Sequence, residues 1–275
     1  MKLTIQNITK AYSTRDQKEK TLLALKDVNL TVETGEFCAI VGESGSGKTT
    51  LSHIITGLIP PTSGKVFFDT EELELSNSKS RKDVFRRIQL VLQDSKSALD
   101  PHFTIYKCIA EPLRNLHRMR RENEKSRVME LLEQMELPKD VLKRKPHELS
   151  GGQQKRVCIA RALAAEPDIL VFDEAISGLD VMLRKSVLDL LKRIHRETGC
   201  TMLFITHDID VALYMADRII VMKNGEIVED VQCSGTPDCL HHPYSKLLAA
   251  AMLPEINNNA AKSVIIQTIN SGGQL

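Results

Sequence analysis

A glycine-rich run at residues 42–49 carries the most specific chemical signal in the sequence. It follows an apolar run, Phe37 to Val41, precedes a helical pattern, and fits G-x-x-x-x-G-K-[ST]. Glycines let successive backbone N–H groups converge on phosphate oxygens at a helix N-terminus. We therefore expect one loop to bind the phosphates of a nucleotide through Gly42, Glu43, Ser44, Gly45, Ser46, Gly47, Lys48, Thr49 and Thr50.

Two acidic residues, Asp173 and Glu174, end a second apolar run that starts at Ile169. Ligands of α/β proteins bind at the carboxyl ends of the strands, so these acids are expected beside the phosphates. A buried carboxylate is costly unless a cation is near; Asp173 is therefore predicted to hold Mg²⁺ together with the hydroxyl of Thr49. Glu174 is predicted to polarise the water that attacks the γ-phosphate, and Lys48 to neutralise the β- and γ-phosphates.

His207 and Gln93 follow apolar runs in the same way, after residues 202–205 and 88–92. Judged alone, each could be an ordinary structural or loop residue. As the third and fourth polar groups at strand ends, they point to the same ligand. His207 is predicted to contact the γ-phosphate, and Gln93 to hold Mg²⁺ or the attacking water.

The short apolar runs alternate with helical patterns, which predicts an α/β sheet. The turn signal Asn224-Gly225 predicts that the sheet ends in a hairpin. The helical spacing of apolar residues between Met182 and Ile194 predicts one helix packed on the sheet. The expected strands are Phe37 to Val41, Ile88 to Leu92, Ile169 to Phe172, Met202 to Thr206 and Ile219 to Met222.

Three further segments organise the chain. Residues from about 95 to 151 are poor in strand signals and rich in helix formers, which predicts an inserted helical subdomain. Residues 13–20 are polar and are expected to join two N-terminal antiparallel strands. We expect the main domain to span residues 1–232, followed by a C-terminal extension and polar tail, 233–275.

Composition excludes several classes of function. The chain of 275 residues has 37 Lys plus Arg against 36 Asp plus Glu, so it has no global attraction for nucleic acid or anionic lipid. Its apolar runs are too short to span a membrane. Six cysteines without CxxC spacing indicate free thiols in a reducing cytoplasm.

The segment Leu149-Ser150-Gly151-Gly152-Gln153 resembles the signature sequence of the ABC ATPase family. It begins a helical pattern, so its N–H groups can form a second anion site. The resemblance implies a P-loop NTPase fold with a mixed sheet, N-terminal antiparallel strands, an inserted helical subdomain and a short C-terminal extension. It also implies ATP and Mg²⁺ as cofactors, and a second ABC ATPase subunit, identical or homologous, placed head to tail. Each ATP would then contact Ser150, Gly151, Gly152 and Gln153 of the neighbouring subunit.

Other residues match the family's remaining motifs, in order, from about Leu3 to Asp230. Tyr12 resembles the aromatic residue that stacks on adenine, and Gln93 the lid glutamine. Asp180 ends a segment that resembles the interface loop, and His207 resembles the switch histidine.

A narrower resemblance is to the ATPases of oligopeptide, dipeptide and nickel importers, with nickel slightly favoured. It rests on Gln93-Asp94-Ser95 with Leu99-Asp100-Pro101, and on His242-Pro243-Tyr244 with Pro254. The lean to nickel rests also on Arg156-Val157-Cys158 and on the run from Phe204 to Asp208. It implies two membrane permease subunits, an extracellular or periplasmic substrate-binding protein, and a place at the cytoplasmic face of the membrane. Asp100 stands where that subfamily often has Asn, and Gly178 where Ala is common in the interface loop. These departures bear on how hydrolysis is coupled to transport rather than on hydrolysis itself.

Three alternatives share the catalytic motifs. An ABC exporter has the same set, although the His-Pro-Tyr element favours import. A DNA-repair ABC ATPase would carry a long coiled coil between Gln93 and Ser150, and the separation here leaves no room for one. A translation-associated ABC protein commonly holds two ATPase units, whereas this sequence has a single phosphate loop.

Overall fold

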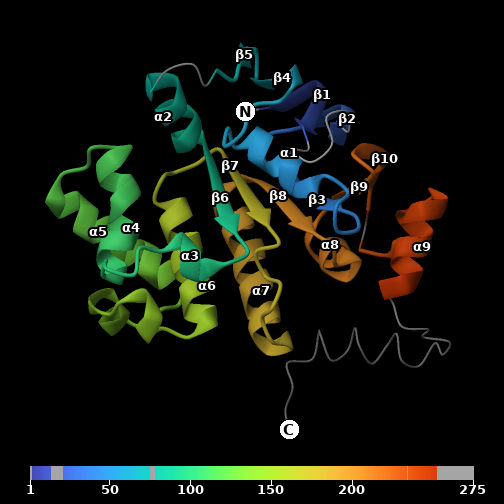
Figure 1. The fold of residues 1–275 in the computed structure, drawn as a ribbon. Helices are drawn as coiled ribbons and strands as arrows, with labels where there is room; N and C mark the ends of the chain where they lie inside the picture. Colours follow the sequence, from blue (N-terminus) through green and yellow to red (C-terminus); the bar gives the residue numbers. More distant parts are fainter. Residues whose placement is uncertain (1, 14–20, 75–77, 234, 253–275) are drawn as a thin grey trace, which may run out of the picture.

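The computed structural model describes residues 2–13, 21–74, 78–233 and 235–252 and is built around a six-stranded sheet (Figure 1). Its strand order is β10-β9-β3-β8-β7-β6; β10 is antiparallel to β9, and the other neighbours are parallel. The expected α/β class with a mixed sheet is confirmed. The strands are β3 (Phe37–Val41), β6 (Ile88–Leu92), β7 (Ile169–Asp173), β8 (Thr201–Thr206), β9 (Arg218–Lys223) and β10 (Glu226–Gln232).

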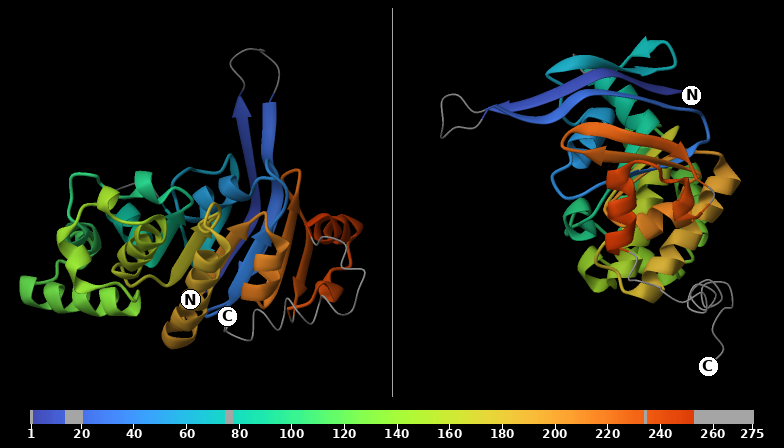
Figure 2. Two further views of the ribbon diagram at one scale, coloured as in Figure 1. Left: turned by 90° about the horizontal axis from the view of Figure 1, so that it is seen from below. Right: turned by 90° about the vertical axis from the view of Figure 1, so that its right-hand side faces the viewer.

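The N-terminal strands form a second sheet. β1 (Leu3–Ser13) pairs antiparallel with β2 (Thr21–Val32), as expected, and also with β4 (Ser63–Phe68), which pairs with β5 (Glu71–Glu72). Figure 2 shows β1 and β2 extending as an arm beyond the rest of the fold. The loop predicted at residues 13–20 lies outside the described residues except for Ser13.

Central strands are buried on both faces because each face is covered by a different layer. Ala39 and Val41 of β3 pack in one apolar cluster, with residues of α6 (Gly151–Leu163), α7 (Val181–Thr198) and α8 (Ile209–Met215). Cys38 and Ile40 point the other way, into a cluster shared with α1 (Lys48–Ile55) and the N-terminal sheet. This period of two explains why these strands are continuously apolar in sequence.

Two local predictions are confirmed. β9 and β10 form a hairpin whose connecting residues Asn224 and Gly225 have φ of 50° and 84°, the positive values that a type I′ turn requires. The predicted apolar stripe lies on α7, where all four of its residues are buried: Val187, Leu190, Leu191 and Ile194.

The stretch from residue 95 to 151 folds into helices on one side of the sheet (Figure 1). Whether the chain divides into domains at residue 232 stays a prediction. Within the described residues, no helix is long and apolar enough to cross a membrane. The remaining helices are α2 (Ser78–Arg87), α3 (Ser95–Ala98), α4 (Ile105–Asn115), α5 (Arg121–Gln134), α9 (Pro243–Met252) and the 3₁₀ turns Lys139–Lys143, Pro146–Glu148 and Pro237–Cys239.

The expectation of six free thiols is wrong for one pair. Cys233, just after β10, and Cys239 form a disulfide, with their Cα atoms 5.4 Å apart. The reversal of the chain between β10 and α9 brings these residues within bonding range, which their spacing in the sequence does not reveal. The free cysteines are all buried: Cys38, Cys108, Cys158 and Cys200. The polar tail predicted after residue 252 lies outside the described residues.

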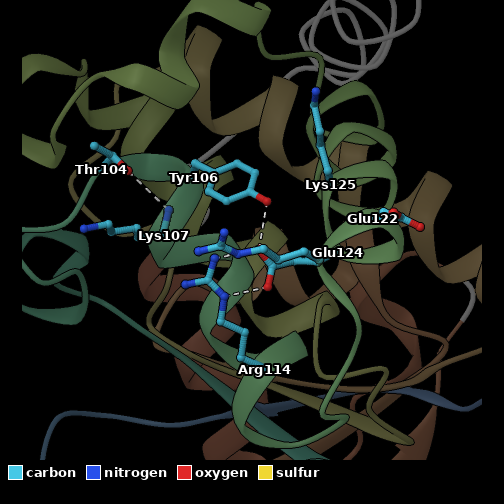
Figure 3. Close-up of a pocket in the computed structure, with 8 residues that line it drawn as sticks. Thr104, Tyr106, Lys107, Arg114, Glu122, Glu124 and Lys125 are labelled. Atoms are coloured by element: carbon cyan, nitrogen blue, oxygen red, sulfur yellow. Dashed lines mark hydrogen bonds and ion pairs between the residues drawn. The ribbon is translucent and has the colours of Figure 1, made fainter.

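A buried carboxylate joins α4 to α5. Glu124 is 1% exposed and accepts hydrogen bonds from Arg114 Nε at 2.5 Å and from Tyr106 Oη at 2.8 Å. Figure 3 shows all three side chains converging within a surface pocket. The bond from Arg114 holds the pKa of Glu124 below its ordinary value, so the ionised form stabilises the folded state.

We predict that Glu124→Ala lowers the free energy of unfolding by about 2 kcal/mol or more, because three charge-assisted hydrogen bonds are lost, two from Arg114 and one from Tyr106. The exposed neighbour Glu122 offers the matched control, and Glu122→Ala should change stability by less than about 0.5 kcal/mol. Because the folded pKa of Glu124 is lowered, its contribution is complete above the unfolded value of about 4.3 and is lost as the pH falls through the folded pKa. Urea denaturation at several pH values measures both effects; equal losses in the two variants would contradict the assignment.

Candidate functional site

The glycine-rich run forms the connection from β3 to the first turn of α1, the strand–loop–helix context that its pattern requires. Gly47 has φ of 104° and ends the loop directly before the helix. A Cβ atom there would lie 2.6 Å from the backbone oxygen of Ala24, on β2. Only glycine fits this position, because both the backbone angle and the space exclude a side chain.

Lys48 folds back over the loop that precedes it. Its Nζ donates to the carbonyl oxygens of Gly42 and Glu43, both at 2.8 Å, and to Ser46 Oγ at 3.3 Å. The side chain is buried, and burial lowers the pKa of its ammonium group, against the opposing effect of nearby carboxylates. A desolvated cation at the N-terminus of a helix is suited to bind phosphate.

Asp173 lies at the end of β7 beside the first turns of α1. Its Oδ2 accepts from Ser52 Oγ at 2.9 Å, and its Oδ1 lies 3.4 Å from Thr49 Oγ1. Burial raises the pKa of Asp173, so a cation beside it would favour the carboxylate. The oxygens of Thr49 and Asp173 are the ligand type that Mg²⁺ prefers, and the pair therefore fits this metal.

Ser52 was missed by the sequence reasoning. It is fully buried and fixes the carboxylate of Asp173. The only signal for it was its place one helical turn after Thr49, on the same face of α1.

Glu174 and His207 lie together at the next positions along the edge of the sheet. His207 Nδ1 is 3.4 Å from Glu174 Oε1, and the backbone N–H of Glu174 donates to Ile205 O at 2.9 Å. Glu174 has φ of 47°, a left-handed conformation that is unusual for glutamate. The strand end thus turns sharply and aims the carboxylate towards the histidine from β8.

Gln93 follows the last residue of β6, Leu92, which pairs with Asp173 on β7. The strand pairing therefore places the backbone of Gln93 at the same edge of the sheet as Asp173, and its role at the metal stays a prediction. Its backbone oxygen accepts from the side chain of Lys155, another residue that the sequence reasoning missed.

The signature segment lies apart from this cluster in the single chain. Ser150 caps α6: its Oγ accepts from Gln153 N at 3.3 Å, while Gln153 Oε1 accepts from Ser150 N at 3.1 Å. A Cβ on Gly152 would touch Leu183 of α7, whereas one on Gly151 would meet no atom within 4 Å. Helix α6 packs chiefly on α3, α4, α5, α7 and β6, whereas α1 packs on β2, β7 and β8.

Two other predicted site residues, Tyr12 and Asp180, also lie away from the phosphate loop and the strand ends beside it. Tyr12 is 40% exposed on the arm made by β1 and β2, with Lys10 Nζ 5.3 Å from its ring centroid. Asp180 caps α7 by accepting from Leu183 N at 3.0 Å. The same turn of α7 carries Arg184, whose ion pair with Asp208 at 2.7 Å ties α7 to the residue after His207.

The C-terminal helix reaches the phosphate loop. Tyr244 Oη accepts from the backbone N–H of Glu43 at 3.4 Å, and Lys223 Nζ lies 4.4 Å from the tyrosine ring centroid. Glu229 of β10 fixes the approach to α9 by accepting from the N–H groups of His241 and His242. The His-Pro-Tyr element thus contacts the site, a role that its sequence did not indicate.

Comparisons with known proteins agree with this geometry. A sequence model of the ABC transporter family matches residues 25–177. The chain is 37% identical over 265 residues to the nickel import ATP-binding protein NikE of Brucella abortus (strain 2308), covering 95% of this chain and 98% of that protein.

Solved structures agree in fold. A dimeric post-hydrolysis state of the ATP-binding cassette MJ0796, bound to ADP and Pi, superposes with a TM-score of 0.75 at 37% identity, covering 84% of this chain and 98% of that chain. The cbiO1 protein from Clostridium perfringens, part of the ABC transporter complex cbiONQ, gives a TM-score of 0.76 at 26% identity, covering 96% and 98%.

The two glycine positions give a paired prediction. Gly47→Ala should lower the free energy of unfolding by about 2 kcal/mol or more and abolish nucleotide binding, because the methyl group meets the backbone of Ala24 at a positive φ. Gly151→Ala should leave stability within about 0.5 kcal/mol of the wild type, because its methyl group enters open space.

Gly151→Ala should also leave ATP binding by the monomer unchanged and slow hydrolysis, if the signature segment covers a nucleotide held by a second subunit. Thermal unfolding, binding of a fluorescent ATP analogue and steady-state hydrolysis separate these effects. A Gly151→Ala protein with wild-type hydrolysis would argue against that placement.

Proposed function

The chain belongs to the ABC transporter family, and from that membership we propose that it is the ATP-hydrolysing subunit of an importer that takes up nickel. The assignment of ATP hydrolysis rests on one cluster of side chains at the edge of the sheet. In this cluster Thr49 of α1 lies beside Asp173, and His207 lies beside Glu174. Nickel as cargo is supported by likeness along nearly the whole chain to a nickel import ATP-binding protein.

ATP is proposed to lie with its phosphates on residues 42–50 and its adenine on Tyr12. Lys48 would release its loop carbonyls and turn its ammonium group to the β- and γ-phosphates. Mg²⁺, held by Thr49 and Asp173 with Gln93 nearby, supplies neutralisation of the phosphate charge when bound. The proximity of Asp173 to Thr49 supports this assignment.

Glu174 is the proposed general base for the attacking water. Its partner His207 would hold the carboxylate in position and contact the γ-phosphate from the neighbouring strand. Their separation of 3.4 Å supports a shared role, since both groups can then face one water-sized site.

A second ABC ATPase subunit is proposed to complete each site. Ser150, Gly151, Gly152 and Gln153 would bind the ATP held by that partner, with Asp180 at the interface. The open space beside Gly151 and the separate packing of α6 and α1 support a ligand shared between two chains. ATP binding would close the pair, and hydrolysis would reopen it.

The rest of the transporter is proposed to comprise two membrane permease subunits and an external substrate-binding protein. The ATPase would sit at the cytoplasmic face of the membrane, with its helical subdomain and Gln93 touching the permeases. Residues 1–232 would form the motor domain, and residues 233–275 an extension whose helix α9 braces the phosphate loop through Tyr244.

We predict that Glu174→Gln keeps ATP binding, slows hydrolysis by at least about 10²-fold, and accumulates an ATP-dependent dimer, because only the base is lost. Lys48→Met is the matched control and should lose ATP binding itself. Single-turnover hydrolysis and size-exclusion chromatography with ATP measure the outcome. Turnover near the wild-type rate in Glu174→Gln would remove the role assigned to this carboxylate.

The cargo is tested on the intact transporter in membrane vesicles. Uptake of radioactive Ni²⁺ should require ATP and should stop when this subunit carries Glu174→Gln. Labelled dipeptides, tested in parallel, should not accumulate. Uptake of the peptides alone would replace nickel as the cargo, and outward movement would favour an exporter.

A further inference from the structure

One face of α6 donates hydrogen bonds to successive backbone carbonyls of the segment after β6. Lys155 Nζ donates to Leu92 O at 2.8 Å and to Gln93 O at 2.9 Å. One turn further along α6, Cys158 Sγ lies 3.8 Å from Ser95 O; after another turn, Arg161 Nη1 donates to Ala98 O at 3.0 Å. A spacing of three residues places these donors on the same side of the helix.

Lys155 makes the shortest of these hydrogen bonds. Its side chain is 2% exposed, and burial lowers the pKa of the ammonium group. A buried ammonium group is costly unless its donors find acceptors, and here two backbone oxygens accept from two of its three N–H groups. An apolar side chain would fill the same space without that cost, so stability alone does not account for a lysine here.

The two ends of this contact belong to different parts of the site. Gln93 adjoins the edge of the sheet at Asp173, since Leu92 pairs with that residue. Lys155 lies in the second turn of α6, two residues after the segment Ser150–Gln153. One side chain therefore connects the backbone beside the chain's own nucleotide site to the start of the signature helix.

We propose that Lys155 is a positioning residue that makes Gln93 and the signature segment Ser150–Gln153 move as one unit. This inference rests on the proposed function, because both ends are assigned to ATP. A shift of Gln93 when the γ-phosphate binds or leaves would then be transmitted to the helix end that faces the partner's ATP. Without Lys155, the phosphate loop would still bind ATP, but Gln93 would lose its own contact with α6, and only Cys158 and Arg161 would hold the later residues of the segment.

The test compares three substitutions in the full-length protein. Lys155→Met keeps length and apolar bulk but removes the donors, and Lys155→Arg keeps charge and donors. Arg156→Met is the control: Arg156 is the next residue on α6 and donates to Met135 O, Glu136 and Ser186, all of them away from the Gln93 segment.

Hydrogen exchange of the nucleotide-free protein gives the first readout. In Lys155→Met, amides of residues 92–98 should exchange about tenfold faster, whereas those of β7 and α5 should be unchanged. Arg156→Met should leave the amides of 92–98 at wild-type rates. Wild-type exchange of 92–98 in Lys155→Met, or equal acceleration in both variants, would overturn the proposal.

Steady-state hydrolysis gives the second readout. Lys155→Met should lower kcat about tenfold with an unchanged KM for ATP, and Lys155→Arg should recover most of the loss. A rise in KM together with accelerated exchange throughout the fold would mean a merely structural role and overturn the proposal. If the wild-type transporter neither hydrolyses ATP nor moves nickel, the proposed function fails, and the exchange measurement still reports on the contact itself.

Discussion

The site depends on one constraint: neighbouring parallel strands must end at the same edge of the sheet. β3 lies beside β8, β8 beside β7, and β7 beside β6, with Val41 opposite Thr206 and Ile205 opposite Asp173. The groups that follow these strands are far apart in sequence but adjacent in space. A slip of one residue in the pairing of β7 would turn the side chain of Asp173 towards the other face of the sheet.

Two apolar layers maintain that alignment. Because the strand ends are buried as well, charged groups there lose part of their hydration, which costs free energy. Alternate residues of β3, β7 and β8 pack into different clusters, so the strands are fixed from both faces. At their ends, Lys48 and Asp173 are buried charges with shifted pKa values. Ser52 and the loop carbonyls satisfy their polar atoms. A polar cluster with satisfied hydrogen bonds in a rigid frame is already arranged for a charged ligand.

Local patterns in the sequence were enough to predict much of this arrangement. The loop at residues 42–49, the hairpin at Asn224-Gly225 and the stripe on α7 each follow from the spacing of a few neighbouring residues. Positions that depend on tertiary packing were not predictable. The disulfide of Cys233 and the contact of Tyr244 with the phosphate loop both arise where the chain folds back after β10.

The burial of Lys155 could not be predicted from the sequence either. Nothing in its sequence context distinguishes it from a solvated lysine on α6; only the packing of α6 on β6 buries it. If each ATP lies between one chain's phosphate loop and the partner's signature segment, every chain links two different nucleotides through Lys155. In a symmetric pair this link runs in both directions. Filling one site would then bias the other towards closure, with Lys155 as the α6 contact nearest to Gln93.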